Sequence, residues 1–149
     1  MKTIPLISAI LFCVACASPA SDGAVKTYSS LAAPTPDNVS LVIKGDRNGQ
    51  KVSVKVGTTI AVELVGAPTA GYMWTLAETP GVLEVAGEYG GPTSSAQLER
   101  GFAGGSHWEA FLFNVMSAGE GELRLEQRRP WESDEPPAER FSVNVLAEE

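Results

Sequence analysis

Three short stretches of the sequence carry the residues whose types and spacing indicate chemistry, and that chemistry is recognition by surface contact. Ala67–Trp74 combines a proline of fixed φ, a hydroxyl and a glycine free to take positive φ. Arg100–Gly105 is rich in glycine, and Arg128–Trp131 places a tryptophan directly after a proline. The candidate binding residues are Pro68, Thr69, Ala70, Gly71, Phe102, Ala103, Gly104, Gly105, Arg129, Pro130 and Trp131.

The first stretch joins two runs that have the pattern of strands, Thr59–Val65 and Tyr72–Ala77. A hairpin between such strands needs only about two to five residues, so one interpretation is an ordinary stiff turn. The other is a pre-ordered recognition loop, which loses little conformational entropy when it docks.

Trp131 in the third stretch also has two interpretations. In a polar loop it would expose a large apolar ring to water, unless it folds back and caps the edge of the fold. Arginine and tryptophan together, as in Arg129-Pro130-Trp131, are the residue types that dominate binding hot spots.

The residues that catalysis or metal binding would need are scarce. His107 is the one histidine, and the two cysteines, Cys13 and Cys16, both lie near the N-terminus. No two of these residues in the domain stand at metal-ligand spacing, and a lone histidine at the start of a strand is usually structural. The acidic run Glu132–Glu135 is most simply a solvated loop face. We therefore expect no enzyme, no metal and no cofactor, and the net charge of −7 argues against nucleic-acid binding.

Residues 1–17 have the pattern of a signal peptide, with Lys2 ahead of the apolar run Ile4–Ala15. Ala15-Cys16-Ala17 fits a cleavage site, whereas Cys13–Cys16 resembles a bacterial lipobox in which Cys16 becomes lipidated. We favour the second ending, an exported lipoprotein of the cell envelope that touches the membrane only through its lipid. Residues 18–36 are expected to form a flexible tether, and residues 37–149 one monomeric domain without a disulfide.

The domain reads as all-β, because apolar and polar residues alternate over short runs separated by glycine and proline turns. About eight strands without an amphipathic helix favour an immunoglobulin-like antiparallel β-sandwich. Tyr89–Gly105 and Arg128–Glu139 are expected to be long irregular loops. The expected strands lie near Val39–Ile43, Val52–Val56, Thr59–Val65, Tyr72–Ala77, Leu83–Val85, His107–Val115, Leu123–Leu125 and Phe141–Val145.

Alternate loops of an antiparallel sandwich emerge at the same end, as the recognition loops of antibody variable domains do. The three stretches occupy alternate connections in the expected strand order. We therefore expect them to share one end of the domain, where a rigid scaffold commonly presents binding residues.

With these motifs in order, the domain resembles the chagasin family, immunoglobulin-fold inhibitors of papain-like cysteine proteases. That family carries Asn-Pro-Thr-Thr-Gly-(Phe/Tyr)-x-Trp, then Gly-x-Gly-Gly, then Arg-Pro-(Trp/Phe). The corresponding residues here are Ala67–Trp74, Phe102–Gly105 and Arg129–Trp131.

The resemblance implies reversible, occlusive inhibition, in which the first loop enters the protease cleft at its catalytic Cys/His pair. The other two loops would clamp either side of that cleft. Three residues depart from the family pattern: Ala67 replaces the Asn, Ala70 replaces the second Thr, and Phe102 stands at the first Gly unless Gly101 fills that role. Losing one or two hydrogen bonds there would cost roughly 1–3 kcal/mol, so weaker or differently targeted inhibition is expected. The alternative function is an exported immunoglobulin-like envelope module that binds a non-protease protein or a glycan.

Overall fold

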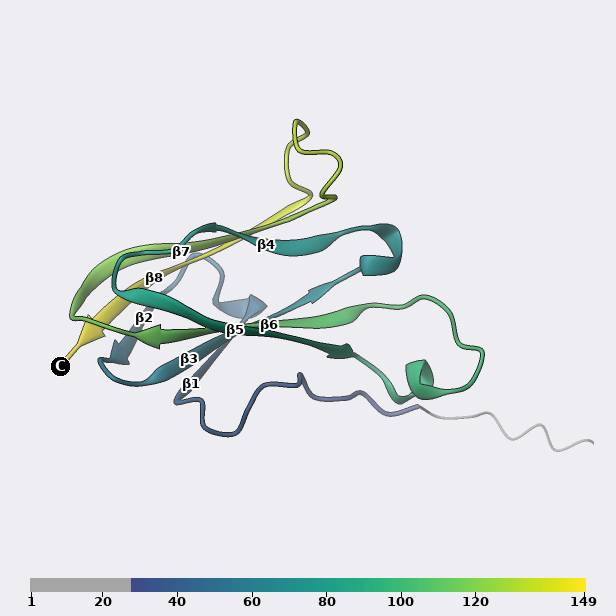
Figure 1. Ribbon diagram of the computed structural model, residues 1–149, viewed down its shortest axis with the longest axis horizontal. Coiled ribbons are helices and arrows are strands. Elements are labelled where there is room, and N and C mark those ends of the chain that lie inside the picture. The colour runs from purple at the N-terminus through teal and green to yellow at the C-terminus, as the bar shows by residue number, and fades with distance from the viewer. Residues whose placement is uncertain (1–27) are drawn as a thin grey trace, which may run out of the picture.

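The computed structural model describes residues 28–149, which form two four-stranded sheets packed face to face (Figure 1). One sheet has the order β1 (Leu41–Lys44), β3 (Thr59–Gly66), β6 (His107–Val115), β5 (Leu83–Pro92). The other has the order β2 (Lys51–Lys55), β8 (Glu139–Glu148), β7 (Gly119–Arg128), β4 (Met73–Glu78). The all-β sandwich of about eight strands is thereby confirmed. The predicted signal peptide, with Cys13 and Cys16, lies outside the described residues.

Each sheet contains one parallel pair at its edge. Leu41 of β1 lies opposite Ile60 of β3, and Lys51 of β2 lies opposite Asn144 of β8, while the remaining pairs are antiparallel. The short 3₁₀ helix η1 (Gly45–Arg47) lies between β1 and β2, which belong to different sheets. The chain therefore crosses the sandwich there instead of turning back in a hairpin.

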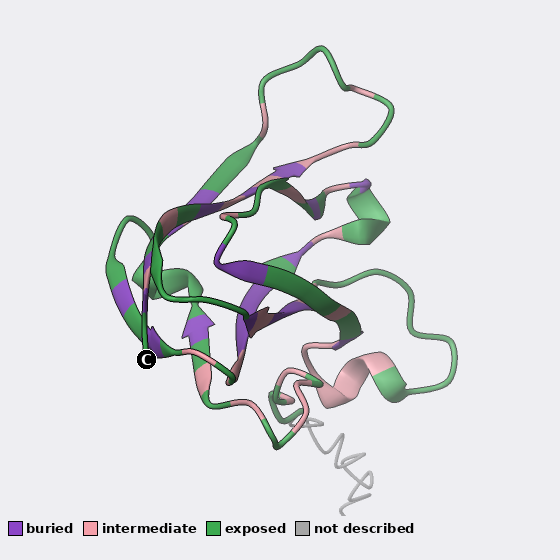
Figure 2. Cartoon of the chain, turned by 60° about the vertical axis from the view of Figure 1, so that its left-hand side comes forward, coloured by how far each residue is buried: buried purple, intermediate pink, exposed green. Residues whose placement is uncertain are grey.

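The core lies between the sheets and follows the alternation of the sequence. Val52 and Val54 of β2 are buried, while Ser53 between them and the flanking Lys51 and Lys55 are exposed. Phe113 of β6 and Phe141 of β8 are the largest fully buried side chains. Figure 2 shows that exposed residues dominate the connections at the rim of the sandwich.

The hairpin interpretation of the first stretch is excluded, and the expected start of the second irregular loop at Tyr89 is wrong. β3 and β4 do not form a hairpin, because they belong to different sheets and only the Ala67–Tyr72 bridge pairs the chain between them. β5 runs ten residues to Pro92, into the stretch expected to be irregular, because residues 89–92 pair with β6 as far as His107. The irregular connection shrinks to residues 93–106, which include the 3₁₀ helix η3 (Ser95–Leu98).

Residues 29–35, which we call the strap, lie along the outer face of the first sheet. The structure thus differs from the expected tether, because this part of residues 18–36 is held by hydrogen bonds: Trp108 Nε1 donates to the Leu31 carbonyl (2.9 Å) and Thr35 Oγ1 to Glu63 Oε1 (2.5 Å). Residues 18–27 lie outside the described part of the chain, so the tether remains a prediction for them. Across residues 28–149 the structure contains no helix with the length and apolar character to cross a membrane.

Candidate functional site

The structure brings the three expected binding stretches together at one end of the sandwich. Loop one (residues 67–72) follows β3, loop two (residues 93–106) follows β5, and loop three (residues 129–138) follows β7. In Figure 1 loops one and two lie at the right-hand end, and loop three projects upward from the neighbouring ends of β7 and β8. The three loops also contact one another, as the following geometry shows.

Loop one is a closed, rigid unit. Its 3₁₀ helix η2 (Pro68–Ala70) starts with a proline and ends at Gly71, whose φ of 84° places it in the left-handed region that favours glycine. Ala67 and Tyr72 exchange backbone hydrogen bonds of 2.9 and 3.1 Å, and Gly71 N–H donates to the Pro68 carbonyl (2.9 Å). The loop thus meets much of its hydrogen-bonding need internally, while Pro68, Thr69 and Ala70 are exposed at its tip.

The base of loop one is fastened by Trp74 and Glu109. Trp74 is buried; its Nε1 donates to the Val65 carbonyl (3.0 Å) and its backbone N–H to Glu109 Oε2 (2.8 Å). Gly66 leaves room for the carboxyl, since a Cβ there would lie 2.9 Å from Glu109 Cδ. Burial raises the pKa of Glu109, the hydrogen bond from Trp74 acts in the opposite direction, and the charge of Glu88 raises it further.

Sequence reasoning missed Glu109, although a signal was present. Glu109 stands on the inward-facing parity of the run that contains Phe111, Phe113 and Val115. A carboxylate at an inward position needs a donor, and Trp74 N–H supplies one. Its second oxygen, Oε1, is buried and has no hydrogen-bond partner among the described residues.

Loop three lies directly against loop one. Arg129 Nε donates to the Ala70 carbonyl (3.0 Å), and its guanidinium carbon lies 4.5 Å from the centre of the Tyr72 ring. Trp131 rests on Gly71, where a Cβ would come within 2.7 Å of Trp131 Cζ2. Trp131 nevertheless stays 70% exposed. It therefore covers loop one with part of its ring and presents the rest to solvent.

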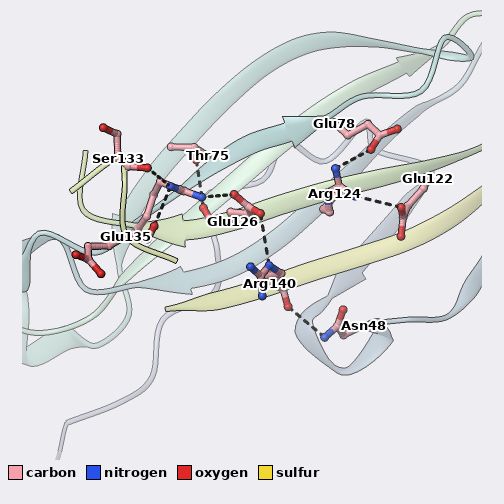
Figure 3. Close-up of polar contacts among 10 residues, drawn as sticks. Asn48, Thr75, Glu78, Glu122, Arg124, Glu126, Ser133, Glu135 and Arg140 are labelled. Carbon is pink, nitrogen blue, oxygen red and sulfur yellow. Dashed lines mark hydrogen bonds and ion pairs between the residues drawn. The ribbon is translucent and has the colours of Figure 1, made fainter. Parts of the chain in front are cut away.

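Arg128, at the end of β7, holds loop three by hydrogen bonds on the outer face of the β2-β8-β7-β4 sheet. Its Nη1 donates to the carbonyls of Ser133 (3.1 Å) and Glu135 (3.4 Å), and its Nη2 pairs with Glu126 Oε2 at 2.5 Å. Figure 3 shows this network continuing from Glu126 to Arg140 of β8. The hydrogen bond from Arg128 is the main reason why the pKa of Glu126 is lowered.

Loop two is organised around the side chain of Gln97, which sequence reasoning did not single out. Gln97 Oε1 accepts from the N–H groups of Thr93 (2.7 Å) and Ser94 (3.0 Å), while Nε2 donates to the Ser106 carbonyl (2.7 Å). One side chain thus ties the two ends of the loop together. Thr69 Oγ1 of loop one donates to the Gly105 carbonyl at 3.5 Å, which links loops one and two.

The remaining predicted residues of loop two face solvent. Phe102, Ala103 and Gly104 are exposed, and Phe102 keeps 46% of its surface accessible. Gly104 and Gly105 have φ of 92° and 100°, which only glycine adopts easily. Loop two therefore lies on one side of loop one, and loop three with Trp131 lies on the other side (Figure 1).

The arrangement fits binding and offers little for catalysis. Within residues 28–149 no three His, Cys, Asp or Glu side chains are placed to hold a metal ion. His107 begins β6, where it pairs with Gly66 and Pro92 in the ladder. This end of the sandwich instead presents the small exposed side chains of loop one together with the exposed aromatic side chains of Trp131 and Phe102.

Comparisons with known proteins point in the same direction. Residues 53–145 match the family model described as Chagasin family peptidase inhibitor I42. The chain is 29% identical over 106 residues to chagasin from Trypanosoma cruzi, covering 67% of this chain and 91% of that protein.

Two solved structures have a similar fold. The crystal structure of the cysteine protease inhibitor EhICP2 from Entamoeba histolytica matches with a TM-score of 0.62 at 15% identity, covering 72% of this chain and 96% of that one. Leishmania mexicana ICP matches with a TM-score of 0.51 at 26% identity, covering 68% of this chain and 90% of that one.

Proposed function

The chain belongs to the chagasin family of peptidase inhibitors, and on that premise we propose that it inhibits papain-like cysteine proteases by occluding their active-site cleft. The observation that carries this proposal is the joining of three loops into one exposed unit. Arg129 and Trp131 attach loop three to loop one, and Thr69 of loop one contacts the Gly105 carbonyl of loop two. Family membership also agrees with the expectation that the chain is an inhibitor and not an enzyme.

In this mechanism the tip of loop one enters the cleft beside the catalytic cysteine and histidine of the protease. Pro68, Thr69 and Ala70 are small enough for a narrow groove, and the closed backbone of the loop leaves little conformational entropy to lose on binding. No bond forms or breaks, so inhibition is reversible and the inhibitor stays intact. Trp131 and Phe102 contact the rims on either side.

The departures from the family motif affect contacts more than the shape of the loop. Ala67 lacks an amide side chain, yet its backbone N–H and carbonyl both bond to Tyr72 and close loop one. Ala70 lacks a hydroxyl, yet its carbonyl still accepts from Arg129. We therefore propose that these substitutions change the affinity of the inhibitor and its choice of protease, while loop one keeps its fold.

A blocking experiment tests the site of action. Papain whose catalytic cysteine has been alkylated with a bulky, cleft-filling reagent should bind the protein far more weakly than papain carrying a small methylthio group on the same cysteine. Equal binding to both forms would contradict insertion into the cleft. Retention of a non-protease protein or a glycan through the same loops, with no binding to papain, would support an envelope-binding module instead.

We also propose that the protein is an exported, monomeric envelope lipoprotein modified at Cys16. The support is the sequence pattern alone, since Cys16 lies outside the described residues. Metabolic labelling with a fatty acid should mark the protein and should fail for Cys16→Ser; unchanged labelling of that variant would contradict the assignment.

A further inference from the structure

The strap forms a short antiparallel pair with the beginning of loop two. Leu31 N–H donates to the Thr93 carbonyl (2.9 Å), Ser95 N–H donates to the Ser29 carbonyl (2.9 Å), and Ser30 bridges Ser94. Ser29 N–H also donates to Ser95 Oγ (2.9 Å). The strap thus pairs with the chain just beyond the end of edge strand β5.

The strap is itself anchored to the outer face of the first sheet. Trp108 Nε1 donates to the Leu31 carbonyl, and Thr35 Oγ1 donates to Glu63, a carboxylate only 8% exposed. Gly91 of β5 leaves space for Pro34, because a Cβ there would lie 3.3 Å from Pro34 Cγ. The strap therefore contacts the sheet through Leu31, Pro34 and Thr35 and contacts loop two through Ser29 and Leu31, so it fixes loop two relative to the sheet.

Loop two needs such support because apolar packing gives it little. Its helix η3 contains no buried residue, and Leu98 at the end of that helix is largely exposed. Hydrogen bonds hold the loop instead: Gln97 joins its ends from within, and the strap holds Thr93 and Ser95 from outside. The strap also precedes residues 53–145, the part of the chain that matches the family model.

We propose that the strap is a positioning element of the binding end, which orders loop two so that it meets the protease in the correct orientation. The proposal rests on the proposed inhibitory function. A loop ordered before binding loses less conformational freedom in the complex, so loosening the strap weakens binding even though none of its residues enters the cleft.

Proline substitution in the full chain tests the proposal. Leu31→Pro removes the N–H that bonds to Thr93, and the extended conformation that proline imposes on Ser30 suits a β-pair. Ala33→Pro is the matched control, since no hydrogen bond joins Ala33 N–H to another of the described residues. Leu31→Pro should accelerate amide exchange at Ser95 and Gln97 in the free protein and weaken papain binding about three- to tenfold. Ala33→Pro should leave both unchanged.

A conservative rescue separates positioning from general destabilisation. Ser95→Ala removes the hydroxyl that accepts from Ser29 N–H, and Ser95→Thr restores one. Alanine should loosen loop two and weaken binding, and threonine should recover both, while the midpoint of thermal unfolding stays within a few degrees of the wild type.

Wild-type exchange and wild-type affinity in both Leu31→Pro and Ser95→Ala would overturn the proposal. Equal losses of affinity and thermal midpoint in Leu31→Pro and Ala33→Pro would also overturn it, because the effect would then be global. If the wild type does not inhibit papain, the proposed function fails instead, and the exchange measurements alone decide whether the strap orders loop two.

Discussion

Trp131 lies across Gly71, so the third loop rests on the one position of the first loop that must be glycine for two independent reasons. The φ of 84° at Gly71 is unfavourable for any residue with a Cβ, and the Trp131 ring occupies the space that a Cβ would take. The two loops are consequently in direct contact, and we expect a change at this contact to affect both.

Gly71→Ala should destabilise the protein by about 1–2 kcal/mol through its left-handed backbone and should also displace Trp131. The matched control is Gly57→Ala, whose φ of 81° is similar but where no atom lies within 4 Å of the added Cβ. Urea unfolding should show comparable losses for the two variants, whereas papain affinity should fall only for Gly71→Ala. Equal papain affinities of Gly71→Ala and Gly57→Ala would show that the packing of Trp131 on Gly71 does not matter for binding.

Trp131→Ala should weaken papain binding by about 2 kcal/mol or more, because a large exposed ring beside an arginine is typical of a binding hot spot. Its effect on the free energy of unfolding should stay below about 1 kcal/mol, since the side chain is 70% exposed. Met116→Ala, which removes a 56% exposed side chain just beyond the far end of β6, is the control and should change neither quantity. A Trp131→Ala variant with wild-type affinity would remove loop three from the proposed interface.

The sequence predicts this fold well wherever alternation is strict and a strand is covered on one face. Val52 and Val54 between lysines are such a case, and the structure buries both valines. The sequence predicts strand ends poorly where the pairing of a strand depends on residues far away in the chain. Gly90 and Gly91 read as loop residues, yet they continue β5, because β6 pairs with them and Pro34 of the strap packs on Gly91.

The candidate site divides in the same way. The exposed residues could be found from local signals, since Pro68 and Gly71 define a stiff turn and Trp131 is an unusual loop residue. The residues that hold the loops could be found only in part. Arg129 and Trp131 belong to a stretch that the sequence singles out, but Gln97 is an ordinary polar residue in the sequence. The roles of Gln97 and of Arg128 arise from backbone groups that only the folded chain brings within hydrogen-bond distance.

Glu109→Gln should change how stability depends on pH. Burial raises the pKa of Glu109 in the folded state above its ordinary value of 4.5, which applies to the unfolded state. At pH values between the unfolded-state pKa and the raised folded-state pKa, the folded state therefore binds more protons than the unfolded state. This carboxyl therefore contributes a loss of stability as pH rises through that window. Glutamine keeps an acceptor for Trp74 N–H but cannot ionise.

The stability of Glu109→Gln relative to the wild type should consequently increase from about pH 4 to about pH 7, as measured by urea unfolding at each pH. Glu84→Gln, on an exposed position of β5, is the control and should follow the wild type. A constant difference between Glu109→Gln and the wild type across this range would show that Glu109 titrates normally.

Ala70→Thr should strengthen inhibition, because it restores the hydroxyl that the family motif carries at the tip of loop one. The backbone carbonyl of this residue bonds to Arg129 and is unaffected by the side chain, so the loop should keep its shape. A gain of about 0.5–1.5 kcal/mol, roughly three- to tenfold in the inhibition constant, is expected from one added hydrogen bond. Weaker inhibition by Ala70→Thr would indicate that the tip of loop one is positioned differently in the cleft.

The most direct test of the account is titration of papain with the purified wild-type protein. We expect reversible, competitive inhibition with one inhibitor bound per protease, and recovery of the inhibitor at its full mass after dissociation. Absence of inhibition at micromolar concentrations, or release of an inhibitor cleaved within loop one, would contradict occlusion of the cleft by these three loops.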